Sequence, residues 1–194
     1  MANQLTPTTD LEAVNQMLAT ILEAPINTLI GVESLDAQKA IATLAEVSRD
    51  LQQVGWHFNT EVKFPLAADA FTGEVHLPSN CLSVDGIECE GLDLVQRGQR
   101  LYDRTNHTFS IGRTVKVDMT ILLPFNDLPE AARRYISVRS CRLFQHRQVG
   151  SATLDGFTAE DEERARMAFR RVMGQVGDHN IFNSPDMQRM LRRK

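Results

Sequence analysis

The feature that most constrains this chain is a change of hydrophobic period inside VGWHFNTEVKF, residues 54–64. Before Gly55 the apolar residues recur three and four positions apart, which is typical of one face of a helix. From Trp56 to Phe64 apolar and polar residues alternate, which is typical of a half-buried strand. Helical spacing returns after Pro124. The sequence therefore predicts a β segment between helical segments.

Two helices are predicted before the change of period. Thr9 and Glu12 have the spacing of a capping box, and the helix that begins there is expected to stop near Pro25. The second helix carries an apolar stripe within residues 37–54. Gly55 follows this stripe as a residue that can adopt positive φ and end the helix.

The central part of the chain contains short β-like runs separated by turn residues. These runs are residues 74–77, 82–89, 92–95, 100–103 and 114–123. Asp85-Gly86 is predicted to be a hairpin turn, and residues 105–112 a longer one. We therefore expect a small antiparallel β domain over residues 59–123.

Two further helices are predicted after the β segment. Pro129 suits the first turn of one of them, and Gly150 and Gly156 are expected to bracket a loop. Thr158 is then expected to begin the last helix and Gly177 to end it.

The predicted fold class is α+β, a discontinuous helical domain of about four helices with an inserted antiparallel β domain. Residues 1–58 and 124–194 form the helical domain and residues 59–123 the β domain. Gly55, Trp56 and Phe58 are predicted to form a buried corner at the junction. On that interpretation, Trp56→Ala costs about 3 to 5 kcal/mol of stability.

The charges are unevenly distributed along the chain. Residues 1–90 contain 3 Lys/Arg against 13 Asp/Glu, whereas residues 91–194 contain 18 against 12. Of the 21 cations 17 are arginine, which is the cation preferred in interfaces and ion-pair networks. The opposite charges could pair within one fold or between subunits, and the sequence leaves both possibilities open.

The sequence contains no clear pattern for a catalytic site or a metal site. The acidic candidates for a carboxylate pair are Asp85, Glu88, Glu90 and the run Glu160–Glu163, none of them bracketed by aromatic residues that would stack on a sugar. The run 160–163 has a sufficient explanation as the acidic first turn of a helix. The possible metal ligands, His76, Cys81, Cys89, Cys141 and His146, lack the paired spacing of a zinc site. No enzyme activity, metal or cofactor is expected.

The sequence also gives little indication of a targeting signal or of sequence-specific nucleic-acid binding. No apolar run approaches the roughly 20 residues that span a bilayer, and the N-terminus does not resemble a signal peptide, so synthesis in a cytoplasm is expected. The closing RMLRRK could contact phosphates, but the net charge is −4. Sequence-specific DNA binding is not expected, although nonspecific proximity to DNA is possible.

Assembly is the class of function that the residues favour. The excess of arginine, the opposite charges of the two halves and a tail that places Met187, Met190 and Leu191 beside cations suit a subunit that docks on neighbours.

Four stretches, in this order and spacing, resemble the tail tubular protein A family, the adaptor or gatekeeper proteins of short-tailed bacteriophages. They are AVNQMLATILEAPINTL (13–29), GWHFNTE (55–61), LYDRT (101–105) and LPEAARRYI (128–136). The resemblance implies a structural protein of the virion tail, made in the cytoplasm of a host bacterium. It covers nearly the whole chain.

The resemblance also implies partners. Twelve copies would form a ring below the portal protein, the nozzle (tail tubular protein B) would dock beneath, and genomic DNA would pass nonspecifically through the lumen. Carried onto this chain by region, the portal-contact candidates are Met187, Met190, Leu191, Arg192 and Arg193, and residues 60–123 would contact the nozzle. The alternatives are a phage-tail polysaccharide hydrolase and a DNA-packaging accessory protein.

Overall fold

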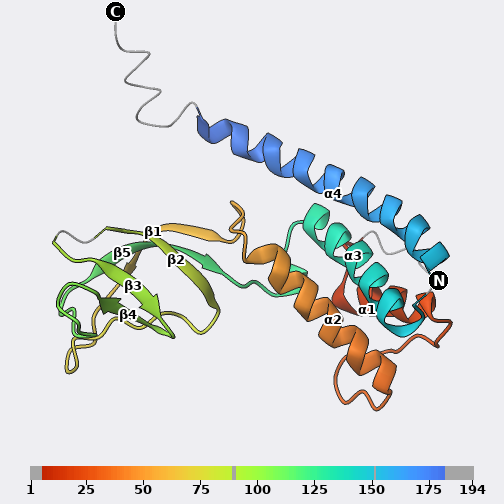
Figure 1. Cartoon of the computed structure of the whole chain (residues 1–194), viewed down its shortest axis with the longest axis horizontal. Helices are drawn as coiled ribbons and strands as arrows, with labels where there is room; N and C mark the ends of the chain where they lie inside the picture. The colour runs from red at the N-terminus through yellow and green to blue at the C-terminus, as the bar shows by residue number, and fades with distance from the viewer. Residues whose placement is uncertain (1–5, 89–90, 151, 182–194) are drawn as a thin grey trace, which may run out of the picture. The chain divides into compact units, whose positions relative to one another are not determined.

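The computed structural model of the chain describes residues 6–88, 91–150 and 152–181 (Figure 1). The chain divides into two compact units, and the α+β class is confirmed. The helical unit comprises residues 1–48 and 124–194, and the β unit comprises residues 49–123. The division therefore comes at residue 49, within a helix, whereas the sequence placed it at residue 59.

The described part of the helical unit contains four α-helices and a short 3-10 helix. These are α1 Asp10–Thr20, α2 Leu35–Gln52, η1 Phe125–Asp127, α3 Glu130–Gln148 and α4 Ala152–Ile181; α2 continues into the first residues of the β unit. The predicted capping box is confirmed: the Thr9 hydroxyl accepts from the Glu12 N–H, and the Glu12 carboxylate accepts from the Thr9 N–H. Both bonds satisfy N–H groups that a helix start leaves free.

The prediction for the last helix was wrong. α4 begins at Ala152 and is continuous to Ile181, so it passes through the expected loop at Gly156 and the expected end at Gly177. An isolated glycine costs a helix only about 1 kcal/mol, which neighbouring helix-forming residues can outweigh.

The helices of this unit pack around one apolar core. Its buried side chains include Val14, Met17, Leu18, Leu44, Val47, Leu128, Ile136, Phe144, Phe169 and Met173. α3 lies against both α1 and α4, and the rings of Tyr135 and Phe169 stack with their centroids 5.7 Å apart (Figure 1). At the surface, Arg147 of α3 donates to both carboxylate oxygens of Glu46 in α2, at 2.6 and 2.8 Å.

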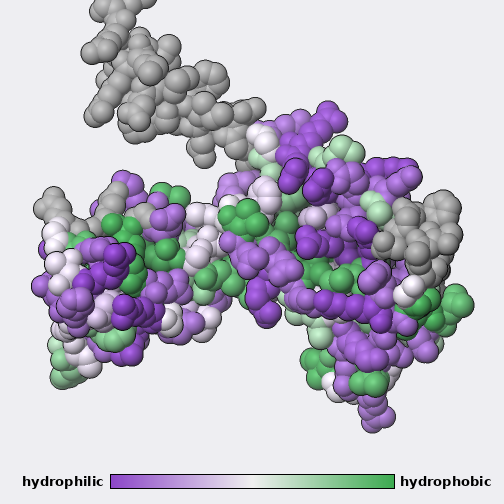
Figure 2. Space-filling model, viewed as in Figure 1, coloured by the Kyte–Doolittle hydropathy of each residue, from purple (hydrophilic) through white to green (hydrophobic). Residues whose placement is uncertain are grey.

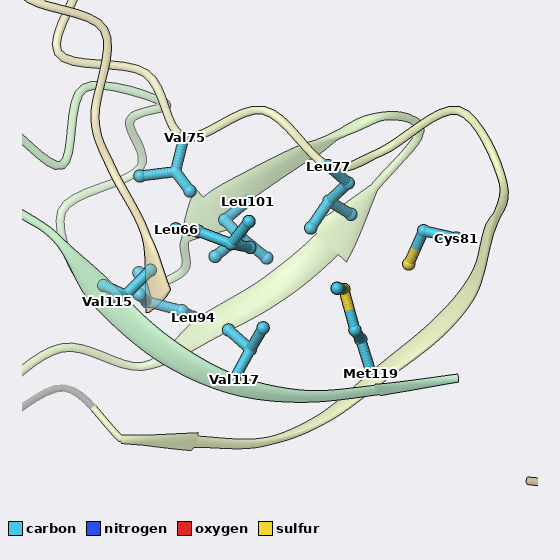
Figure 3. Close-up of a cluster of buried hydrophobic side chains, with 9 residues drawn as sticks. All are labelled: Leu66, Val75, Leu77, Cys81, Leu94, Leu101, Val115, Val117 and Met119. Atoms are coloured by element: carbon cyan, nitrogen blue, oxygen red, sulfur yellow. The ribbon is translucent and has the colours of Figure 1, made fainter. Parts of the chain in front are cut away.

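The β unit is built on a three-stranded antiparallel sheet in the order β1-β5-β2, with β1 Thr60–Leu66, β5 Val115–Ile121 and β2 Cys81–Glu88. A separate hairpin pairs β3 Leu94–Arg97 with β4 Arg100–Asp103 through Gly98, whose φ is +61°. Figure 3 shows the side chains that fill the space between these strands, namely Leu66, Val75, Leu77, Cys81, Leu94, Leu101, Val115, Val117 and Met119.

The predicted alternation over residues 56–64 fails within this sheet. β1 begins at Thr60 rather than Trp56, and its pairing with β5 shifts register between Glu61 and Phe64. Lys63 adopts φ +54°, and its N–H donates to the Asp118 carboxylate at 2.7 Å. An irregularity of this kind re-aims side chains, so Val62 and Phe64, which the sequence placed in the core, are exposed. The predicted turn at Asp85-Gly86 is also wrong, because β2 runs through it.

The residues before β1 turn around the amide of Asn59, which is 1% exposed. Its Nδ2 donates to the carbonyls of Gln52 and Ile121, both at 2.9 Å, and its Oδ1 accepts from the Trp56 N–H at 2.8 Å. The Gln52 side chain, also buried, accepts from the Leu123 N–H and donates to the Leu123 carbonyl. Two amides thus tie the segment that leads into the β unit to the one that leads out.

The predicted corner residues surround this pair of amides. Gly55 adopts φ +78°, as a helix-ending glycine does. Trp56 is half-buried and its indole N–H donates to the Leu51 carbonyl at 2.8 Å, while Phe58 is half-buried as well. The fully buried residue is Asn59, which the sequence had placed on the polar face of a strand.

We expect Asn59→Ala to destabilise the β unit by roughly 3 kcal/mol, because it removes the partner of the Trp56 N–H and of the Ile121 carbonyl and one of the two donors to the Gln52 carbonyl. Urea unfolding followed by the fluorescence of Trp56, the single tryptophan, measures this change beside the substituted site.

Asn80→Ala is the matched control. Asn80 is exposed and its side chain makes one hydrogen bond, to the Leu122 carbonyl at 3.2 Å. Its loss is expected to cost less than about 1 kcal/mol. Equal costs for the two variants would contradict the structural role assigned to Asn59.

Candidate assembly surfaces

The candidate catalytic acids of α4 are engaged in ion pairs. Glu160 and Asp161 both lie within 3.4 Å of Arg164, and Glu163 lies 2.8 Å from Arg166. Glu162 reaches Arg142 of α3 at 3.0 Å. The first three contacts join residues three and four apart on one helix, and the fourth joins two helices. These ion pairs explain the acidic run, but the predicted reason was wrong: because α4 begins at Ala152, residues 160–163 lie within the helix and not in its first turn.

The other chemical candidates do not converge. Among the residues that the structure describes, no three His, Cys, Asp or Glu side chains are grouped in a way that could hold a metal ion. Cys81 is buried in the core of the β unit, Asp85 is exposed on β2, and His76 lies 3.5 Å from Glu74. The side chain of Glu88, and the residues Cys89 and Glu90, lie outside the described part.

A hollow of about 540 Å³ opens between α3 and α4, and two of the three arginines that line it are paired with carboxylates. Its lining includes Arg142 and Arg166, which pair with Glu162 and Glu163, and Arg139, which donates to the Tyr135 hydroxyl at 3.4 Å. The Arg142–Glu162 pair joins the two helices, whereas each of the other two contacts lies within one helix. We therefore interpret the hollow as part of the helix packing rather than as a ligand site.

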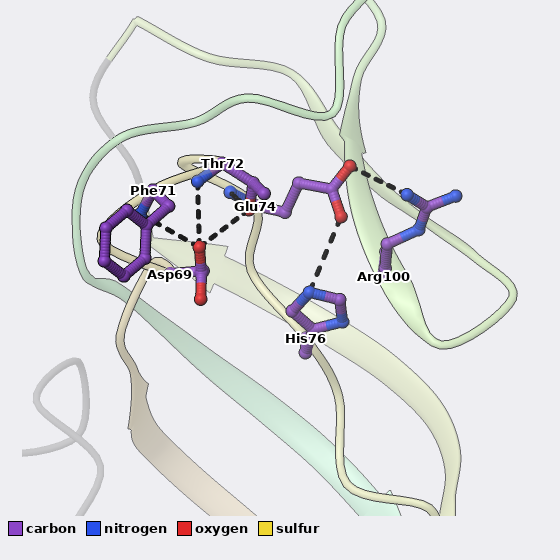
Figure 4. Close-up of polar contacts among 6 residues, drawn as sticks. All are labelled: Asp69, Phe71, Thr72, Glu74, His76 and Arg100. Atoms are coloured by element: carbon purple, nitrogen blue, oxygen red, sulfur yellow. Dashed lines mark hydrogen bonds and ion pairs between the residues drawn. The ribbon is translucent and has the colours of Figure 1, made fainter.

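The most prominent feature of the β unit is a rigid turn that presents one aromatic ring (Figure 4). The Asp69 carboxylate accepts from the N–H groups of Phe71 and Thr72 at 3.0 and 2.8 Å, and from the Thr72 hydroxyl at 3.0 Å. Backbone bonds from Asp69 to Glu74 and from Gly73 to Asp69 close the turn. We call residues 69–74 the Asp69 turn; its Phe71 side chain is 98% exposed.

The neighbours of the Asp69 turn are also fixed in place. Gly73, with φ +70°, accepts at its carbonyl from the N–H groups of Ile111 and Gly112. A Cβ at Gly73 would approach the Ser110 hydroxyl to 2.5 Å, so glycine is required for this close contact. Glu74 pairs with Arg100 at 2.7 Å and with His76 (Figure 4). Phe71 is therefore exposed on an ordered support.

Beside this turn, side chains of the β3–β4 hairpin stack with Phe109, which follows β4 in the chain. Arg97 lies 3.7 Å above the Tyr102 ring, and Arg100 lies 4.2 Å above the Phe109 ring. The two rings meet edge to face at 4.9 Å. Such cation–π and edge-to-face contacts limit the motion of long side chains, so this surface also is preformed.

The helical unit has its own exposed apolar segment, the connection between α1 and α2 together with Leu35, the first residue of α2. We call residues 21–35 the 21–35 loop. Leu22, Ile30 and Leu35 are 96%, 87% and 64% exposed. The side chain of Asn15 in α1 both donates to the Ile26 carbonyl and accepts from its N–H, at 3.0 and 2.8 Å. Each unit thus displays large apolar side chains on a segment that hydrogen bonds hold in shape.

A model of the tail tubular protein family matches residues 11–178. The chain belongs to this family. No curated protein matches the chain closely enough to add a characterised relative. The match extends over both units and over all ten helices and strands given above except the last residues of α4 and the first of α1. The exposed apolar segments therefore belong to a structural component of a phage tail.

The sequence also raised the questions of a membrane span and of a set of portal-contact residues. No helix in the described ranges is long and apolar enough to cross a membrane. The portal-contact candidates Met187, Met190, Leu191, Arg192 and Arg193 lie outside the described residues.

Sequence reasoning missed Phe71 and Leu22 as surface features. A signal for the first was present in DAFTG, residues 69–73, where an aspartate precedes a threonine and a glycine in the manner of an Asx turn. Leu22 has no such signal, because its apolar type and helical spacing both predict burial.

The Asp69 turn is expected to respond to acid. Hydrogen bonds from Thr72 and Phe71 hold the pKa of the Asp69 carboxyl below its ordinary value. Because the pKa is lowered in the folded state, the ionised carboxylate stabilises the turn. This stabilisation is complete above the ordinary carboxyl pKa and is lost as the pH falls through the lowered value. In an NMR titration, the amide signals of Phe71 and Thr72 should therefore shift with a midpoint below that of aspartate in an unstructured peptide. A midpoint at or above that of the peptide would contradict the turn geometry, and Asp69→Asn is expected to abolish this transition.

The cysteine of α3 is expected to be unreactive. Burial raises the pKa of the Cys141 thiol to about 11, and the nearby Arg134 offsets only part of the effect. Because the thiolate is the reactive form, alkylation of native protein at pH 8 should be on the order of 100-fold slower at Cys141 than in the urea-unfolded chain. Peptide mass spectrometry after timed iodoacetamide labelling measures the ratio, and equal rates would show that the thiol is accessible and ionised.

Proposed function

We propose that this tail tubular protein is the adaptor of a short-tailed phage. In this proposal a ring of copies, twelve by resemblance, joins the portal protein to the tail nozzle and surrounds the path along which the genome leaves the capsid. The observation that carries the proposal is the presence of an ordered, exposed apolar segment on each of two compact units. A subunit that connects two different partners needs at least two such surfaces.

The β unit supplies the surface for the nozzle. Phe71 has the properties of a docking anchor: a large ring, almost complete exposure, and a backbone already fixed by hydrogen bonds. Aromatic residues dominate the binding energy of many interfaces, and a preformed support reduces the entropy lost on binding. The nozzle partner would offer an apolar pocket for this ring.

The helical unit and the C-terminal residues face the portal in this proposal, with Met187, Met190, Leu191, Arg192 and Arg193 as contact candidates. In this proposal genomic DNA passes through the lumen of the ring and must slide along it. A chain of net charge −4 suits this requirement, because strong phosphate binding needs dense positive charge. Contact with DNA in the lumen is therefore expected to be weak and independent of sequence.

We expect Phe71→Ala to weaken binding to the nozzle protein of the same phage by at least about 10-fold, because the anchor ring is lost. The melting temperature and the binding of portal protein should not change, since Phe71 makes almost no contact within its own chain. Val62→Ala is the matched control: it removes another exposed apolar side chain, 67% exposed, from the same unit.

If Phe71→Ala binds the nozzle with wild-type affinity, the assignment of the Asp69 turn as the nozzle contact is overturned. A wild-type chain that binds neither the portal nor the nozzle would overturn the adaptor proposal itself. Biolayer interferometry with each partner immobilised in turn separates these two results.

A further inference from the structure

We infer that the 21–35 loop of one copy docks on the outward face of α4 in the neighbouring copy. The inference rests on the ring of the proposed function and names the two surfaces that close it. Both surfaces belong to the helical unit: the loop displays apolar side chains beside glutamates, and α4 displays a methionine beside two arginines.

The 21–35 loop is apolar and acidic. Besides the exposed Leu22, Ile30 and Leu35 it carries Glu23 and Glu33, and it contains no Lys or Arg. Both glutamates are exposed, and neither makes a hydrogen bond or ion pair through its side chain among the residues described. A partner surface for this loop therefore needs apolar side chains and positive charge.

The backbone of the loop is held in an unusual shape at its first turn. Leu22 adopts φ +61°, a conformation that glycine normally supplies at a helix end. The N–H of Leu22 donates to the Ala19 carbonyl at 3.2 Å, and that of Glu23 to the Leu18 carbonyl at 3.1 Å. The Leu22 side chain is 96% exposed, so no burial within its own chain offsets the strain of its backbone. Burial of this side chain against another subunit would stabilise the conformation.

The outward face of α4 has the complementary chemistry. Phe169 and Met173 are buried on the side that packs against the rest of the unit, and Met167, 56% exposed, lies on the opposite side. Arg170 and Arg171, three and four residues beyond Met167, are exposed beside it. In the described part of the chain neither arginine makes an ion pair. We call Met167, Arg170 and Arg171 the α4 outer face.

The two surfaces lie on opposite sides of the helical unit. Figure 1 shows α4 along one side and the 21–35 loop at the far ends of α1 and α2. In Figure 2 hydrophobic surface gathers at the end of the unit that holds this loop, while hydrophilic surface predominates along α4. The loop of a chain is thus remote from its own α4. Such an arrangement joins copies head to tail, and a head-to-tail contact forms a closed ring when the rotation between copies is suitable.

The test reverses the charges of one surface at a time. The loop variant is Glu23→Arg with Glu33→Arg, and the α4 variant is Arg170→Glu with Arg171→Glu. Each variant alone brings like charges together at every contact and should not form rings even at 10-fold the concentration at which the wild type does. A 1:1 mixture should form rings, because loop and α4 outer face are then complementary at every contact of an alternating ring.

Ring formation is measured by native mass spectrometry and electron microscopy, with portal protein present if the wild type needs it. The matched control, Asp50→Arg with Glu61→Arg, reverses two exposed acidic residues of the β unit and should form rings like the wild type. All the substituted residues are exposed, and circular dichroism checks that each variant is folded.

Rings from either reversed variant alone would overturn the inference and leave the adaptor proposal standing. Loss of portal binding with rings intact would assign the surface to the portal instead and also overturn it. A mixture that fails to assemble, although the wild type forms rings, would overturn the pairing of these two surfaces. A wild type that forms no ring, alone or with portal, would contradict the proposed function on which the inference rests.

Discussion

The arrangement of the β unit depends on the buried amide of Asn59. Three polar groups from two segments, the Gln52 carbonyl and the Trp56 N–H at the end of α2 and the Ile121 carbonyl of β5, bond to this one side chain. The Gln52 carbonyl also accepts from the Gly55 N–H, but without the Asn59 side chain the Trp56 N–H and the Ile121 carbonyl would lose this partner, and leaving a buried polar group unsatisfied costs more free energy than one hydrogen bond contributes. The segments that lead into and out of the unit are therefore held together at one point, and the sheet begins next to it at Thr60.

Each unit keeps its exposed apolar segment in shape with its own residues. The β unit has a core of nine buried side chains from its own strands and loops, and the Asp69 turn is braced by hydrogen bonds to residues 111 and 112. The helical unit has a core of its own, and its exposed loop is likewise clamped by Asn15. An apolar side chain on an ordered segment binds a partner more tightly than the same side chain on a flexible loop, because less conformational entropy is lost on binding.

The parts of the fold that the sequence predicted correctly are those in which local chemistry decides. The capping box at Thr9, the apolar stripe of α2, Gly55 at positive φ and the strand at residues 100–103 all follow from patterns within a few residues. The family likewise followed from short stretches, and the match over residues 11–178 confirms it.

The errors occur where tertiary contacts override the local pattern. The alternation through Val62 and Phe64 predicts burial, but the left-handed conformation of Lys63 and its bond to Asp118 expose both side chains. Glycine at 156 and 177 predicts breaks in α4 that the helix does not make. Leu22 and Phe71 are apolar but exposed, against the usual pattern; the turn signal DAFTG was available for Phe71, whereas no spacing rule identifies Leu22 from one sequence.

The central claim is that one chain assembles with itself and connects two different partners. Native mass spectrometry of the purified chain, mixed with portal and nozzle proteins of its phage, tests that claim most directly. We expect a single assembly in which many copies of this chain are present together with both partners. A chain that stays monomeric and retains neither partner would contradict the claim.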